Sequence, residues 1–213
     1  MSKEFIEQCF LWNIFIFNIL QMKLMYYGEC VCLRALELED LDDILKHWNN
    51  LELRQYLSSQ TPMSRQAERQ WLERATTLDP WRDGGMTLAI EDKKTKEFLG
   101  TVSLFTISSQ HKAAEFGIAI HNPENLSKGY GTDATRVMLW IAFHILGLNS
   151  VFLRTLDSNK RAQKAYEKAG FKNAGVTRQG AFVKGTFHDA IIMDILKEEF
   201  LKVYPPGTEV GKP

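Results

Sequence analysis

The sequence predicts an α/β (α+β) protein whose central sheet, mixed but mostly antiparallel, has about seven strands and is flanked by about four helices. Segments of strand character alternate with amphipathic segments of helical period along the chain. Three strand-like segments between residues 86 and 121 are separated only by short polar turns, which indicates an antiparallel meander. The chain has 213 residues and 45% apolar content, which suits one core of ordinary size.

The first part of the expected domain combines one strand with three helices. Residues 31–35 form a short strand, and residues 38–48 form an amphipathic helix with acidic residues in its first turn. Residues 52–57 form a second helical piece. A third helix follows Pro62, and Ser64 is its expected N-cap.

Strands dominate the remaining chain. The meander strands are expected at residues 86–91, 98–107 and 113–121. The later elements are a long helix at 129–146, a strand at 151–155, a helix at 159–169 and a strand pair from residue 172 that turns near Lys184-Gly185. We expect the segment from Tyr204 onward to be a frayed end.

Charge and cysteine content exclude several classes of partner. Lysine plus arginine and aspartate plus glutamate both number 26, so net charge predicts neither nucleic acid nor an anionic membrane as partner. Cys9, Cys30 and Cys32 lack the spacing of a metal site, so no metal is expected. Their odd number, without a signal-peptidase site, favours a cytoplasmic location.

The N-terminus is unusually apolar. Residues 9–20 are interrupted only by Asn13 and Asn18, and the run is shorter than the ~20 residues that a membrane-spanning helix needs. It could pack on the body, form the arm of a homodimer, or precede a later start at Met22 or Met25. No stable membrane insertion is expected. We therefore divide the chain into an extension (1–25), a domain (26–197) and a tail (198–213).

A glycine pair marks a candidate phosphate site. Gly129 and Gly131 leave backbone N–H groups unobstructed where the long helix begins, and helix N-termini bind phosphate through such groups. The same stretch also matches the dinucleotide pattern G-x-G-x-x-A, with Asp157 after the next strand. Seven residues separate the preceding strand from Gly129, whereas the dinucleotide motif follows its strand directly.

Two further segments carry candidate chemistry. Asn159 and Tyr166 are two helical turns apart and share one helix face, and Gly170 ends that helix. In the strand at 113–121, alternation places Glu115 and His121 on one face. A carboxylate in a strand rich in apolar residues is costly unless it has a partner or a function.

Taken together, these segments resemble the GNAT N-acetyltransferase superfamily. The resemblance rests on the strand with Glu115, the Gly-x-Gly helix start and the pattern N-x-R-A-x-x-x-Y-x-x-x-G-F at 159–171. Within the superfamily, the chain is similar to the branch of ribosomal-protein and spermidine acetyltransferases, over about residues 26–196. The GNAT fold and acetyl-CoA as co-substrate are what this resemblance implies.

The resemblance also implies which residues contact acetyl-CoA. The loop would hold the pyrophosphate, the backbone of the strand would pair with the pantetheine amides, and Asn159 would lie near the thioester. Leu126 departs from the Gln or Arg that usually opens the loop. The cofactor-binding residues carried over are Ile118, Ala119, Ile120, Ser127, Lys128, Gly129, Tyr130, Gly131, Thr132 and Asn159.

The expected catalytic residues follow from the acid–base needs of the reaction. A primary amine must lose a proton before it attacks a thioester, and the departing thiolate must gain one. Tyr166 matches the general acid of the family, and Glu115 matches the position of its base, acting through a water. His121 is the alternative base, and His188 is a third candidate that is expected to be a surface side chain.

Three functions remain open at this stage. The first is acetylation of a protein N-terminal amine, as in the ribosomal-protein enzymes. The second is acetylation of a polyamine or another small amine, and the third is a non-catalytic acyl-CoA-binding role. The expected acceptor segments, 48–64 and 179–188, hold few carboxylates, Glu52 being the main one, whereas a polyamine site would need several. This scarcity favours a peptide N-terminal amine or a small amine with an uncharged backbone, and we take the protein N-terminal amine as the main expectation.

Overall fold

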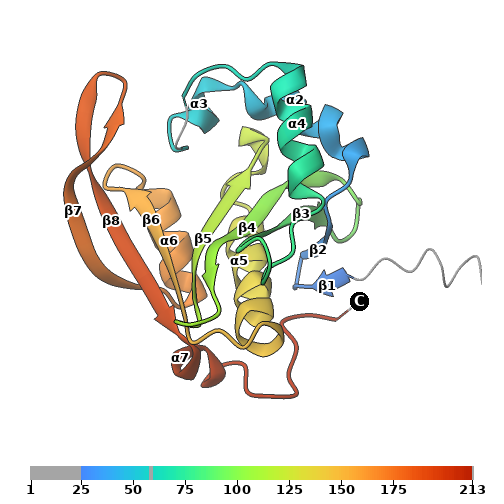
Figure 1. The fold of residues 1–213 in the computed structure, drawn as a ribbon, viewed down its shortest axis with the longest axis vertical. Helices are drawn as coiled ribbons and strands as arrows, with labels where there is room; N and C mark the ends of the chain where they lie inside the picture. Colours follow the sequence, from blue (N-terminus) through green and yellow to red (C-terminus); the bar gives the residue numbers. More distant parts are fainter. Residues whose placement is uncertain (1–24, 58–59, 213) are drawn as a thin grey trace, which may run out of the picture.

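The computed structural model describes residues 25–57 and 60–212, and these form one sheet of eight strands with helices on both faces (Figure 1). The apolar segment at 9–20 lies outside the described residues. The strand order is β1-β2-β3-β4-β5-β6-β8-β7, and only β5 and β6 are parallel neighbours. The strands are β1 (Met25–Tyr27), β2 (Val31–Ala35), β3 (Met86–Asp92), β4 (Phe98–Ser108), β5 (Ala113–Ile120), β6 (Ser150–Leu156), β7 (Lys172–Val183) and β8 (Thr186–Leu196).

The mixed, mostly antiparallel sheet expected from the sequence is confirmed, with one strand more than predicted. The additional strand is β1, which pairs with β2 so that Tyr26 faces Leu33. Three residues are too few to show an alternating pattern, so periodicity could not distinguish β1 from the segment before it. Pairing with β2, a tertiary contact, defines this strand.

The helices lie close to their predicted positions. They are η1 (Leu38–Asp40), α2 (Leu41–Trp48), α3 (Leu51–Arg54), α4 (Arg65–Ala75), η2 (Pro123–Asn125), α5 (Tyr130–Trp140), the π-helical turn η3 (Ile141–Ile145), α6 (Lys160–Ala169) and α7 (Lys197–Leu201). The Ser64 hydroxyl accepts a hydrogen bond from the Ala67 N–H at 3.1 Å, which confirms the predicted N-cap of α4. In the part of the chain that the structure describes, no helix could cross a membrane.

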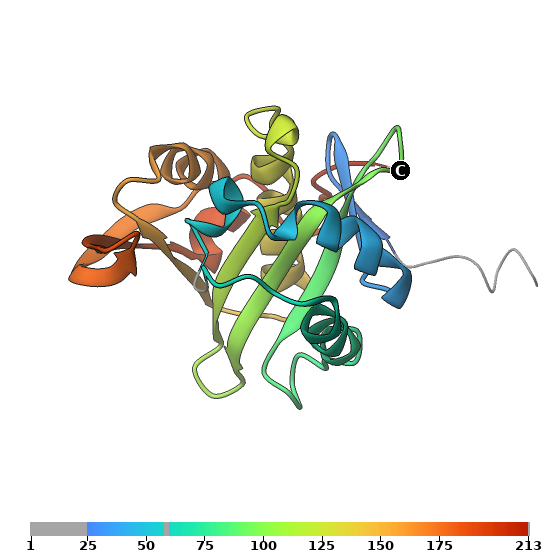
Figure 2. The ribbon, with the colours of Figure 1, turned by 90° about the horizontal axis from the view of Figure 1, so that it is seen from above.

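Helices lie on both faces of the sheet, as the view from above shows (Figure 2), and a cluster of buried apolar side chains lies on each face. On one face, α5 and the strands bury the larger cluster, whose fully buried side chains include Leu33, Leu104 and Met138. On the other face, α2 and α4 pack on the sheet through Ile44 and Leu72. Both faces of the central strands are therefore covered, while the ends of β5 and β6 remain available for a site.

A buried carboxylate fixes the start of α5. Asp133, 4% exposed, accepts hydrogen bonds from the backbone N–H groups of Glu29, Cys30 and Val31 at 3.0, 2.8 and 3.0 Å. A Cβ at Gly28 would lie 2.4 Å from a carboxylate oxygen of Asp133, so only glycine fits there. These contacts join the first turn of α5 to the turn between β1 and β2.

The C-terminal segment corrects the expectation of a frayed end. Its backbone accepts a hydrogen bond from the Trp140 indole at Thr208 (2.7 Å), and Tyr204 O lies 3.1 Å from the His144 ring. Tyr204 also stacks on Phe200. The segment passes beneath α5 and ends beside β1 (Figure 1), so it is held by side chains of α5 and η3 that are distant in sequence.

We predict that Asp133→Asn lowers the free energy of unfolding by about 2–3 kcal/mol, because three hydrogen bonds to a buried charged acceptor weaken together. Urea denaturation followed by circular dichroism measures this change. The control is Asp43→Asn, an exposed acid in the first turn of α2, with an expected cost under about 1 kcal/mol. Equal losses in the two variants would contradict the assignment of Asp133.

Candidate active site

The sheet opens between β5 and β6. These strands pair over only three residue pairs, from Ala113–Ser150 to Glu115–Phe152, and then separate. Beyond Glu115, β5 keeps its hydrogen bonds to β4 on one side, and no strand of residues 25–57 or 60–212 pairs with it on the other. Because unpaired backbone groups in a strand readily bind an extended ligand, this open edge suits a chain that carries amide groups.

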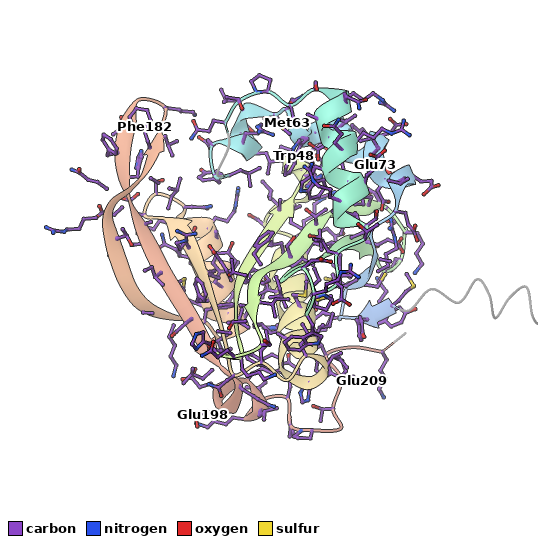
Figure 3. All side chains as sticks on the ribbon, in the orientation of Figure 1. Trp48, Met63, Glu73, Phe182, Glu198 and Glu209 are labelled. Carbon is purple, nitrogen blue, oxygen red and sulfur yellow. The ribbon has the colours of Figure 1, made fainter. Side chains whose placement is uncertain are left out.

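A cleft of about 740 Å³ occupies the opening. Its walls come from β4, β5, the end of β6, α6, the loop before α5, Trp71 of α4, and the segment from Trp48 to Leu57. Figure 3 shows Trp48 beside α2 and α4, and Phe182 at the tip of the β7–β8 hairpin across the parted strands. The cleft thus has the size of a ligand site, with one side along α6 and another below α2 and α3.

The glycine loop lines the cleft at the start of α5. Gly129 is the residue before the helix and has a φ of +93°, a conformation that favours glycine. A Cβ at Gly129 would meet nothing within 4 Å, so the backbone faces open space. Gly131 lines the same wall. The free N–H groups of this helix start can therefore bind phosphate, and the residues present fit the pyrophosphate of a coenzyme A molecule.

The other predicted cofactor residues divide into two groups. The cleft is lined by Ile118, Ala119, Ile120, Ser127, Thr132 and Asn159, and by Leu126. The side chains of Lys128 and Tyr130 are engaged elsewhere: Lys128 Nζ donates to Asn125 Oδ1 at 3.2 Å, and the Tyr130 hydroxyl donates to Asp92 Oδ2 at 2.7 Å. These two residues could contact a phosphate through their backbone N–H groups only.

Asn159 and Tyr166 both line the cleft from α6, as their spacing predicts. Asn159 also caps α6, since its Oδ1 accepts from the Ala162 N–H at 3.2 Å. The Tyr166 ring packs edge-on against Phe116 and Phe171, with centroid distances of 6.1 and 6.0 Å. Burial raises the pKa of Tyr166 to about 12, so its hydroxyl keeps its proton at neutral pH and can donate it.

Glu115 stands at the point where β5 and β6 separate. Arg154 of β6 contacts both of its carboxylate oxygens, at 3.0 and 3.3 Å, while Arg154 itself also lines the cleft. The Glu115 side chain is about one-fifth exposed. Glu115 is not itself among the lining residues, but it contacts one of them, Arg154, at the point where the two strands separate.

His121, the alternative base, lies at a position unsuited to proton transfer. It is 2% exposed, packed between Trp48 and Phe98, and its Nδ1 has no hydrogen-bond partner. Burial, with a smaller contribution from the nearby His47, lowers the pKa of His121 to about 3. His188 is only partly buried and contacts Asp157 at 3.3 Å.

Sequence reasoning missed the roles of the arginines around the cleft. Arg154 pairs with Glu115, Arg54 lies 5.5 Å from the Trp48 ring centroid, and Arg161 lies 6.0 Å from that of Tyr56. The alternation of β6 marks Arg154 as a charged residue on one face of a strand. The sequence did not indicate that Glu115 is the partner of Arg154, because the pairing of β5 with β6 joins residues 39 positions apart.

Comparisons with known proteins agree with this geometry. The spermidine N(1)-acetyltransferase of Escherichia coli K12 is 28% identical over 195 residues, covering 87% of this chain and 97% of that protein. The crystal structure of the Vibrio cholerae spermidine N-acetyltransferase in complex with CoA and spermine superposes with a TM-score of 0.72 and 28% identity. It covers 82% of this chain and 99% of the other.

Two Bacillus subtilis proteins match shorter stretches. The uncharacterised N-acetyltransferase YoaA is 29% identical over 113 residues, which span 53% of this chain and 63% of that protein. YdaF, provisionally named a ribosomal N-acetyltransferase, is 33% identical over 101 residues, 47% of this chain and 55% of that protein.

The chain also matches a family as a whole. The acetyltransferase (GNAT) domain matches residues 31–172, which contain the open edge of β5, the glycine loop and both Asn159 and Tyr166. This confirms the resemblance seen in the sequence. The chain belongs to the GNAT acetyltransferase family and is an N-acetyltransferase.

Proposed function

We propose that this protein transfers the acetyl group of acetyl-CoA to the primary amine of a small molecule. The observation that carries the proposal is the parting of β5 and β6, which opens one cleft lined by the glycine loop, Tyr166 and Arg154, the partner of Glu115. The sequence favoured a protein N-terminal amine as acceptor. The relatives support the small-molecule alternative better, because matches to spermidine acetyltransferases extend over almost their whole length.

The cofactor half of the cleft is the side along α6 and the glycine loop. In our proposal, the N–H groups around Gly129 and Gly131 hold the pyrophosphate, and the free backbone edge of residues 118–120 pairs with the pantetheine amides. Lys164 and Lys168 line the same side and would neutralise phosphate charge. Acetyl-CoA, when bound in this way, supplies an activated acetyl thioester beside Tyr166.

The catalytic residues act on two protons. Glu115, through a water, accepts the proton that the amine must lose before its nitrogen lone pair attacks the acetyl carbonyl carbon. The carbon–nitrogen bond forms, the nitrogen releases its second proton to solvent, and the carbon–sulfur bond breaks. Tyr166 donates its proton to the departing sulfur and regains one from solvent. Arg154 orients the carboxylate of Glu115 through its two contacts.

We predict that Tyr166→Phe lowers kcat roughly a hundredfold or more, because general acids contribute about 10²–10⁴-fold. The measurement is steady-state release of CoA thiol with saturating acetyl-CoA. Tyr204→Phe, in the C-terminal segment and outside the cleft, is the control and should leave kcat unchanged. The pH range 6–9 lies well below the Tyr166 pKa of about 12, so the wild-type hydroxyl is protonated throughout it. Unchanged activity of Tyr166→Phe over this range would exclude Tyr166 as the acid.

We predict that Gly129→Ala weakens CoA binding by about tenfold, equivalent to ~1.4 kcal/mol, because the added methyl group projects into the space for phosphate. Isothermal titration with CoA measures the Kd. The control is Gly147→Ala, which also has positive φ and open space at Cβ but follows η3, outside the cleft. Both variants should lose about 1 kcal/mol of stability, so only the change in Kd separates them. An equal Kd in the two variants would contradict the phosphate site.

Mass spectrometry of reaction products tests the acceptor class directly. We predict that, with acetyl-CoA, a panel of small amines yields acetylated products and a set of N-terminal peptides, including ribosomal-protein N-termini, yields none. Acetylation of peptides alone would reverse the assignment. Binding of acetyl-CoA without any acetylated product would support the non-catalytic role instead.

A further inference from the structure

The acceptor half of the cleft, below α2 and α3, is apolar. We define it by the side chains on the opposite side of Tyr166 from the glycine loop, and among the described residues no aspartate or glutamate lines it. Aromatic rings form much of its surface, and the reacting end meets β4 and β5. Its apolar lining consists of Trp48, Leu53, Tyr56, Leu57, Trp71 and Phe105.

The carboxylates of Glu115 and Glu68 offer this half no free negative charge. Arg154 contacts both oxygens of Glu115. Glu68 of α4 is 1% exposed, so its side chain is closed off from a ligand. Burial raises the pKa of Glu68, against the smaller opposing effects of the positive charge of Arg54 and a hydrogen bond from Trp48. One carboxylate is therefore paired with an arginine and the other is buried.

Arginines also occupy two aromatic faces that could otherwise bind an ammonium group. The Arg54 guanidinium lies over the Trp48 ring at 5.5 Å, and that of Arg161 lies over the Tyr56 ring at 6.0 Å. Cation–π contacts are the main way for a site without carboxylates to hold an alkylammonium. Because Trp48 and Tyr56 already interact with guanidinium groups, a cationic ligand would have to displace them.

The remaining charges of the cleft are positive. Arg161, Lys164 and Lys168 are three and four residues apart on α6, share one face, and line the cleft. No acidic side chain in the described part of the chain forms an ion pair with them. They suit the phosphates of CoA and repel any acceptor that carries further positive charge.

From these contacts we infer that the acceptor is a primary amine with an uncharged, largely apolar body, and that a second ammonium group is selected against. The inference rests on the proposed function. The reacting amine is neutral when it attacks, so it needs no counter-ion. A second ammonium group would lose its hydration in the cleft without gaining a counter-ion in return. A site can be specific because a competing ligand would leave a charge without a partner, as well as because the preferred ligand makes good contacts.

Hexylamine and 1,5-diaminopentane test the inference, because they have equal numbers of non-hydrogen atoms. Hexylamine ends in a methyl group where 1,5-diaminopentane carries its second ammonium group. We expect kcat/KM to be at least about tenfold higher for hexylamine, since an unpaired like charge is strongly penalised. Titration of each amine into the CoA-bound protein should likewise show that hexylamine binds more tightly than 1,5-diaminopentane. Equal or better use of 1,5-diaminopentane or spermidine would overturn the inference.

A charge added to the acceptor half should reverse the preference. Leu53→Glu places a carboxylate in the lining and should shift the ratio of the two kcat/KM values at least about tenfold toward the diamine. Leu51→Glu, on the same helix but 58% exposed and outside the cleft, should not shift it. If circular dichroism shows that Leu53→Glu is unfolded, Tyr56→Glu serves instead, because Tyr56 is partly exposed. No shift in a folded lining variant would contradict the inference.

Failure of the inference and failure of the proposed function give different results. If the diamine is acetylated as efficiently as hexylamine, the small-amine function stands and the inference about charge is wrong. If neither amine is acetylated and peptides are, the proposed function fails and the inference fails with it.

Discussion

The parting of β5 and β6 after three residue pairs is the constraint on which the site depends. A sheet continued without a break would satisfy the backbone of residues 118–120 and leave no edge for an extended ligand. Because the strands diverge, side chains from β4, β5, β6 and α6 face a common space instead of packing against each other. Glu115 lies at the last paired position, so the same geometry places the carboxylate at the mouth of the opening.

An opening in the sheet can bind a ligand in a defined position only if the elements around it, α5 above all, are fixed relative to the sheet. Asp133 joins the first turn of α5 to the β1–β2 turn, directly beside the glycine loop. At the other end, Trp140 and His144 bind the C-terminal segment. The helix whose first N–H groups we propose to bind phosphate is therefore anchored at both ends by contacts between residues distant in sequence.

Arginine side chains around this cleft contact acidic and aromatic side chains of the same chain. Arg154 neutralises Glu115, Arg54 lies beside Glu68 and Trp48, and Arg161 covers Tyr56. Each arginine reduces the ability of an acidic or aromatic group to recognise a cation. A fold shared with spermidine acetyltransferases can in this way present an acceptor surface of different chemistry, because function depends on side chains placed on a common backbone.

The sequence alone determined the order of elements, the N-cap Ser64, the helix ending at Gly170, and the placement of Asn159 and Tyr166 on one face, because these depend on periodicity and on local hydrogen bonds. It could not distinguish Glu115 from His121, since alternation gives both residues the same face of β5. Tertiary structure separated them: α2 and β4 bury His121, whereas β6 brings Arg154 to Glu115. Burial and ion pairing arise from neighbours distant in sequence, so only the folded chain decided that His121 is enclosed and that Glu115 pairs with Arg154, a residue of the cleft wall.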